Sequence, residues 1–189
     1  MVVGSRVAHT GTAAGPVRVA RPQDLPRIVS TQRLSMRVLG ARCYSELQIE
    51  SVIRYMTMME EQLLTDGTYY VAEAGGVIAG CGGWSVRTPA YRTGADAQPT
   101  THSSAKVRAF YVHPDHARRG VGRALLDVVE AAIAAAGHEE AVLDATVSGM
   151  PFYKRCGYRA VACTHIGFPN GVRLPMVCML KRVAGGEPR

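Results

Sequence analysis

One segment, residues 107–129, constrains the fold of this chain more than any other. It reads VRAFYVHPDHARRGVGRALLDVV: a β-rich apolar run that stops at Pro114, then arginines and glycines, then an amphipathic pattern. Because proline cannot donate to a sheet ladder, the strand predicted over residues 106–112 ends before it. Apolar residues at helical spacing predict a helix over residues 120–136, stopped by Gly137. A strand, an Arg/Gly turn and a helix start therefore follow one another.

This turn carries the groups that a phosphate or diphosphate needs. The first turn of a helix leaves N–H donors without intrahelical partners and has a partial positive charge. Gly120 and Gly122 would let an anion approach those donors, and Arg118, Arg119 and Arg123 add positive potential. A plain strand-to-helix connection with exposed arginines is the alternative interpretation. The P-loop pattern and the GxGxxG pattern are both absent, so the usual ATP and NAD sites do not fit.

Length and composition indicate one ordinary globular domain. The chain has 189 residues, enough for a sizeable core, with 47% hydrophobic and 20% charged residues. No apolar run is long enough for a membrane helix, and the N-terminus lacks an apolar signal region, so a cytoplasmic location is expected. The five cysteines form no CxxC pair and are odd in number, which argues against a disulfide framework and a metal site.

Periodicity and turn residues predict an alternation of strands and helices in one domain. Glycines at positions 80, 82 and 83 suggest a bulge or a close backbone approach in one strand. We expect a flexible tail at 1–16, a domain at 17–183, a tail at 184–189 and a long polar loop at 87–104 that could be a substrate lid. The predicted strands are 17–20, 68–74, 77–86, 106–112, 141–147, 158–167 and 172–182, and the predicted helices are 22–40, 45–63, 120–136 and 150–155.

Two blocks of sequence carry a family resemblance. In HPDHARRGVGRALL, Gly120 and Gly122 are spaced as in the pattern Q/R-x-x-G-x-G/A, and PFYKRCGY is similar to FYxxxG followed by Phe or Tyr. With the opening RVARPQDLPRI, residues 17 to 182 resemble the GNAT superfamily of acyl-CoA-dependent N-acetyltransferases. This chain departs from the family at Ala117, which replaces the leading Gln or Arg, and at Thr146 and Gly149, where Asn and Ala are frequent.

The resemblance implies a single-domain α/β (α+β) fold. Its central sheet would be mixed and mostly antiparallel, with about six to seven strands flanked by about four helices. The fourth strand would splay from the fifth near Tyr111 and Val112, so that free backbone groups can bind pantetheine and the acetyl carbonyl. The co-substrate would be acetyl-CoA, held by Tyr111, Val112, Arg118, Arg119, Gly120, Val121, Gly122, Arg123 and Ala124.

The implied reaction is direct acyl transfer in a ternary complex. An amine attacks the thioester carbonyl, and CoA leaves as a thiolate. Tyr153 is the predicted general acid: a phenol with a pKa of about 10 can protonate a leaving thiolate whose conjugate acid has a pKa of about 8.5, a slightly uphill transfer that a positioned hydrogen bond makes workable. Packing against pantetheine is the alternative. The general base is left open among Glu60, Glu61, His113, His116 and a chain of waters.

Two other functions compete with this one. A catalytically degenerate domain could bind acyl-CoA as a sensor. The net charge of +7, nearly all from arginine, could instead serve a nucleic-acid-binding module, but aromatic residues make up only 6% and no reading helix stands out, so no nucleic acid is expected. The expected acceptor is an amine on a small molecule or peptide, without a metal or a membrane, and a homodimer is left open.

Overall fold

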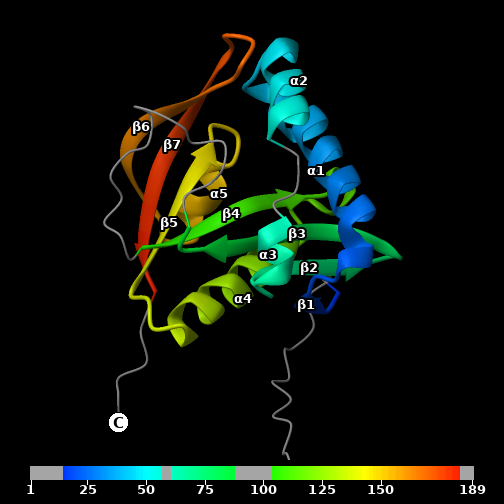
Figure 1. Ribbon diagram of the computed structural model, residues 1–189, viewed down its shortest axis with the longest axis vertical. Helices are drawn as coiled ribbons and strands as arrows, with labels where there is room; N and C mark the ends of the chain where they lie inside the picture. The colour runs from blue at the N-terminus through cyan, green and yellow to red at the C-terminus, as the bar shows by residue number, and fades with distance from the viewer. Residues whose placement is uncertain (1–14, 57–60, 88–103, 184–189) are drawn as a thin grey trace, which may run out of the picture.

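The computed structural model describes residues 15–56, 61–87 and 104–183 (Figure 1). Their core is one seven-stranded sheet in the order β1-β2-β3-β4-β5-β7-β6, in which only β4 and β5 run parallel. The predicted mixed, mostly antiparallel sheet is thus confirmed. The strands are β1 Val17–Val19, β2 Tyr69–Ala74, β3 Val77–Ser85, β4 Ala105–Val112, β5 Glu140–Thr146, β6 Arg159–Gly167 and β7 Arg173–Arg182.

Five α-helices accompany the sheet in the described residues, where about four were predicted. The second predicted helix begins at the expected capping box: the Gln48 N–H donates to Ser45 Oγ (3.3 Å), and the Ser45 N–H donates to Gln48 Oε1 (3.0 Å). It ends at Tyr55, however, and a separate helix α3 begins at Glu61, although the apolar spacing predicted one helix through both. The helices are α1 Leu25–Leu39, α2 Glu46–Tyr55, α3 Glu61–Thr65, α4 Val121–Ala135 and α5 Met150–Arg155, with 3-10 turns η1 Pro22–Asp24, η2 Gly40–Arg42 and η4 Pro114–His116.

The first half of the sheet is covered on both faces. Alternation along β2 sends Tyr69 and Val71 to the side where Ile28 of α1 packs, while Ala72 faces Val121 of α4. The inward side of α1 is more polar than its apolar spacing predicts, because Thr31, Gln32 and Ser35 are buried there as well. The two glycines of the turn between β2 and β3 have φ values of 57° and 77°, which confirms the predicted two-residue hairpin.

The most consequential feature of the sheet is the separation of β4 from β5 (Figure 1). Among the described residues these strands pair at only two positions, Ala105 with Ala141 and Lys106 with Val142. The strands therefore part well before Tyr111, where the splay was predicted. Beyond Lys106, β4 stays paired with β3, whereas β5 follows β7 along its whole length.

Most of the predicted loop 87–104, the tails at 1–14 and 184–189, and Glu60 lie outside the described residues.

Candidate functional site

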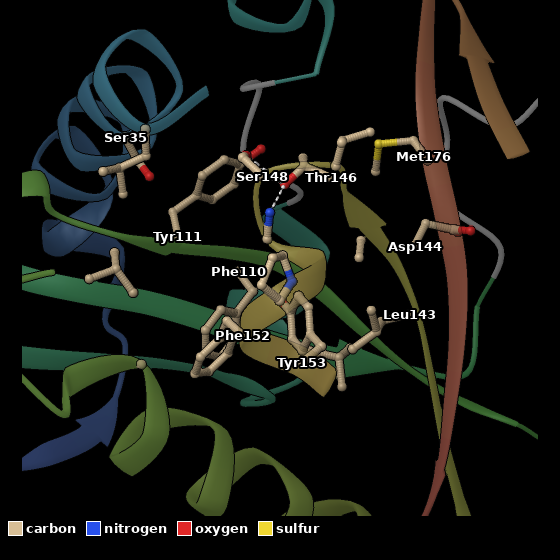
Figure 2. A pocket seen from close by; sticks show the side chains of 18 of the residues that line it. Ser35, Phe110, Tyr111, Leu143, Asp144, Thr146, Ser148, Phe152, Tyr153 and Met176 are labelled. Carbon is tan, nitrogen blue, oxygen red and sulfur yellow. Dashed lines mark hydrogen bonds between the residues drawn. The ribbon is translucent and has the colours of Figure 1, made fainter. Parts of the chain in front are cut away.

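A cavity of about 1350 Å³ opens where β4 and β5 part. Its walls come from both strands, from the start of α4, from α5, from α1 and η2, and from β7. Figure 2 shows side chains from these elements around it, with Tyr111 and Phe110 on the β4 side, Asp144 and Thr146 on the β5 side, and Tyr153 on α5. The cavity thus joins the Arg/Gly turn to Tyr153.

The Arg/Gly turn has an unusual backbone. Arg118 has a φ of 64° and Gly120 a φ of 85°, both in the left-handed region, and Gly120 is the N-cap of α4. No side chain among the described residues caps this helix start. Helical geometry therefore leaves the N–H groups of Val121, Gly122 and Arg123 without intrahelical partners, and they remain available to an anion.

Not every residue predicted for this cradle lines the cavity. Ala117, Arg118, Gly120, Gly122 and Arg123 line it, as do Tyr111 and Val112. Arg119 is exposed, the Val121 side chain is buried in the core, and the Ala124 N–H donates to the Gly120 carbonyl (3.0 Å). The side chains of Arg119, Val121 and Ala124 are therefore outside the cavity wall.

The backbone near Gly122 approaches its neighbours closely. A Cβ at this position would lie 3.3 Å from both the Phe152 ring and Val112 Cγ2. The glycine therefore lets the first turn of α4 sit against the second sequence block, which contains Phe152. Uncapped amides, a left-handed glycine and two arginines, of which Arg123 is paired with Asp127 (2.8 Å), give this turn the donors and charge that an anion needs.

Tyr153 lies at the other end of the cavity, on α5. It is 8% exposed, and its ring contacts those of Phe152, Tyr158 and Phe110 at centroid distances of 5.0, 5.6 and 6.0 Å. Burial raises the pKa of the Tyr153 phenol above its usual value. The Tyr153 phenol therefore holds its proton more firmly than an exposed tyrosine does.

The turn that leads into α5 is held by hydrogen bonds that the sequence did not reveal. The Gly149 N–H donates to Thr146 Oγ1 (3.1 Å), and the Val147 N–H donates to Tyr44 Oη (2.8 Å). Tyr44 Oη in turn donates to the Pro175 carbonyl (2.8 Å), and burial raises the pKa of this phenol to about 12. Tyr44 therefore ties the connection between α1 and α2 to β5 and β7.

Asp144 is a site residue that the sequence reasoning missed. Its neighbours Leu143 and Ala145 are buried in the core, so alternation turns Asp144 to the opposite face of β5 (Figure 2), and all three residues line the cavity. Lys106 and Arg108 of β4 line the same cavity. The available signal was a single carboxylate inside the otherwise uncharged strand AVLDATV.

The three described side chains among the predicted candidates for a general base lie elsewhere. Glu61 is exposed on α3, and neither it nor His113 or His116 lines the cavity. The two histidine rings contact each other at 5.6 Å, and His113 Nδ1 accepts the Asp115 N–H (3.3 Å). Asp144 is thus a better placed carboxylate than Glu61.

The described residues contain neither a candidate metal centre nor a candidate membrane span. Within residues 15–56, 61–87 and 104–183, no three His, Cys, Asp or Glu side chains gather as a metal site would require. In the same part of the chain, none of the helices combines the length and the apolar character needed to cross a bilayer.

Comparison with known proteins gives a consistent result. The sequence model of the Acetyltransferase (GNAT) domain matches residues 65–160, which include both sequence blocks, and no curated protein matches significantly. A GCN5-related N-acetyltransferase from Rhodopseudomonas palustris is 23% identical, with a TM-score of 0.70, over 93% of this chain and 99% of that one.

Two structures solved with coenzyme A compounds share the fold. PaiA N-acetyltransferase from Thermoplasma acidophilum, in complex with coenzyme A, is 21% identical with a TM-score of 0.63, over 88% of this chain and 98% of that one. YncA from Salmonella typhimurium, with acetyl-CoA, is 17% identical with a TM-score of 0.59, over 92% and 96% of the two chains. The domain match spans more than half of the sequence and agrees with the fold, and this chain therefore belongs to the GNAT acetyltransferase family.

Proposed function

We propose that this protein transfers an acetyl group from acetyl-CoA directly to an amine while both are bound. The observation that carries the proposal is that one cavity is lined by the uncapped start of α4, by β4 and β5 where they part, and by Tyr153. A coenzyme anchored by its diphosphate at one end would present its thioester inside the gap. A metal or redox group has no role in this scheme.

The cofactor contacts follow from the cradle. Acetyl-CoA supplies the acetyl group as an activated thioester. The N–H groups of Val121, Gly122 and Arg123 would bind its diphosphate, with Arg118 and Arg123 contributing charge from the cavity wall. Arg119 would contribute to binding only through its positive charge at a distance. Ala124 would contribute only by continuing the helix whose first turn binds the diphosphate. The stretch of β4 at Tyr111 and Val112, which lines the cavity beyond the point where β4 leaves β5, would bind the pantetheine arm.

Tyr153 is the proposed general acid. Its raised pKa keeps the proton on the phenol until negative charge develops on the leaving sulfur. The proton then moves from Tyr153 Oη to that sulfur as the carbon–sulfur bond breaks. The aromatic surroundings exclude water, which strengthens the hydrogen bond at the moment it is needed.

Asp144 is the proposed contact for the incoming amine. A carboxylate on the cavity wall attracts a cationic amine and offers an acceptor for the proton that the nitrogen loses. It replaces Glu61, His113 and His116 as our candidate base. The acceptor itself is an amine on a small molecule or a peptide.

An acceptor screen that detects free CoA thiol tests this function. Purified protein is incubated with acetyl-CoA, or with longer acyl-CoAs, and a panel of small amines and peptides with free N-termini. We expect thiol release that depends on one class of amine. Binding of acetyl-CoA without turnover across the whole panel would favour the acyl-CoA sensor, and absence of binding would contradict both.

A further inference from the structure

One residue of β4 has a backbone conformation that is unusual for a strand. Ala109 has a φ of 48°, in the left-handed region where a Cβ meets steric resistance. It lies at a β-bulge, because the register between β3 and β4 shifts between Cys81 and Gly83 and leaves Gly82 opposite an extra residue. Such a conformation persists only where the surroundings hold it in place. Ala109 also lines the cavity, so what holds it matters for the site.

A buried phenol holds this bulge. Tyr69 Oη donates to the Ala109 carbonyl (2.7 Å) and accepts a hydrogen bond from Gln32 Nε2 of α1 (3.1 Å). Tyr69 is 0% exposed and Gln32 is 1% exposed. Burial raises the pKa of Tyr69 well above its usual value, so the phenol keeps its proton and its bond to the carbonyl at all working pH values.

The glycines of β3 make this contact sterically feasible. Tyr69 belongs to β2, and β3 lies between it and β4. A Cβ at Gly83 would lie 2.7 Å from Tyr69 Cδ2, so only glycine lets the ring pass over β3. A Cβ at Gly82 would lie 2.4 Å from the Phe110 ring, so glycine is needed on the other side of the bulge too. These contacts confirm the bulge and close approach predicted for the glycine-rich strand.

We propose that Tyr69, supported by Gln32, is a positioning residue for acetyl transfer. The peptide unit is planar and trans, so the Ala109 carbonyl and the Phe110 N–H point in opposite directions. The phenol that fixes the carbonyl therefore fixes the direction of that N–H and of the strand edge that follows, where Tyr111 and Val112 meet the coenzyme. This inference rests on the proposed function, because it assigns Tyr69 a role in aligning the same thioester.

A double-variant cycle tests the proposal. Tyr69→Phe keeps the ring and removes the donor, and we expect kcat to fall about tenfold while the KM for acetyl-CoA changes less than about twofold. Glycine adopts a positive φ without steric cost, so Ala109→Gly in the Tyr69→Phe background should restore kcat to within about threefold of the wild type. Tyr70→Phe is the matched control, since the neighbouring phenol lies on the opposite face of β2, and it should leave kcat unchanged.

Amide hydrogen exchange separates failure of this inference from failure of the proposed function. We expect faster exchange at residues 109–112 in Tyr69→Phe than in the wild type or Tyr70→Phe, whether or not an acceptor amine has been found. Unchanged exchange and unchanged kcat would overturn the positioning role. A kcat loss that Ala109→Gly does not restore would also overturn it, because the loss would then come from general destabilisation. An inactive wild type with the predicted exchange pattern would instead remove the proposed function.

Discussion

The end of the cavity at the start of α4 is made from one short stretch of chain, whereas the end around Tyr153 is assembled from distant elements. The first end uses residues 117–123, is largely exposed, and relies on backbone N–H groups. The second combines Tyr153 of α5 with Phe110 of β4, while Asp144 lines the cavity from the other face of β5 and Tyr44 anchors the turn before α5. The end at α4 therefore depends on backbone groups, whereas the end around Tyr153 depends on side chains.

This difference determines how each end should respond to substitution. The proposed backbone cradle should tolerate changes of side chain, which would account for Ala117 at the position where the family pattern has Gln or Arg. The proposed proton donor, Tyr153, is buried among the Phe110, Phe152 and Tyr158 rings, so its loss should be hard to compensate. We expect large effects on kcat at the buried end and small effects on affinity at the exposed end.

The largest effect is expected for Tyr153→Phe. Removing a positioned general acid should lower kcat about 100-fold or more, while the dissociation constant for acetyl-CoA stays within about twofold. Thiol-release kinetics and calorimetry measure the two quantities. Tyr55→Phe, on α2 and outside the cavity wall, should behave as the wild type. A Tyr153→Phe enzyme with unchanged kcat would remove the phenol from the chemistry.

A somewhat smaller effect is expected for Asp144→Asn. Loss of the charge should lower kcat/KM for the amine about 30-fold, as expected for the loss of a charge-assisted hydrogen bond. The affinity for acetyl-CoA should not change. Steady-state kinetics with the amine varied provide the measurement. Glu139→Gln is the control, because that carboxylate forms only a surface ion pair with Arg182 (3.2 Å). Equal losses in both variants would show that the effect comes from net charge and not from the site.

At the exposed end, Arg118 and Arg119 form a matched pair. Arg118→Ala should weaken the binding of acetyl-CoA about fivefold, because an exposed ion pair contributes little to affinity. The loss of affinity should shrink as salt is added. Arg119→Ala should have almost no effect, since that side chain does not line the cavity. Calorimetric titrations at two salt concentrations compare them. Equal weakening would mean that the arginines act as a diffuse positive field instead of through a contact.

The smallest expected effect is the absence of an alkaline limb in the pH profile. Burial raises the pKa of Tyr153 above its ordinary value near 10, so the phenol loses its proton only at still higher pH. From pH 7 to about 10 the acid therefore stays in its active form, and kcat should not fall for this reason. A fall of kcat below pH 10 that is present in the wild type and absent in Tyr153→Phe would contradict the raised pKa of Tyr153.

Local chemistry made much of the fold and the cradle predictable. The Pro114 stop, the Gly75–Gly76 turn and the Ser45 capping box each depend on residues close in sequence, and all appear as expected. The two family blocks were found because each is contiguous. The helix predicted over residues 45–63 divides into α2 and α3, since apolar spacing cannot show where a helix is interrupted.

The buried end was less predictable because its contacts join distant residues. Tyr44 is 131 residues from Pro175 in the chain, and Tyr69 is 40 residues from Ala109. Nothing near Tyr44 or Tyr69 in the sequence distinguishes these phenols from other core aromatics. Asp144 could have been noticed as the one charged residue of AVLDATV. Its access to the cavity, however, depends on the gap between β4 and β5.

An NMR titration of the protein with acetyl-CoA is the most direct measurement, because it locates the coenzyme residue by residue. If the gap between β4 and β5 holds the thioester and the start of α4 holds the diphosphate, the largest amide shifts will fall at residues 118–124, at residues 109–112 and beside Tyr153. Saturable shifts confined to other surfaces, or no shifts at millimolar acetyl-CoA, would contradict the placement on which the proposed chemistry depends.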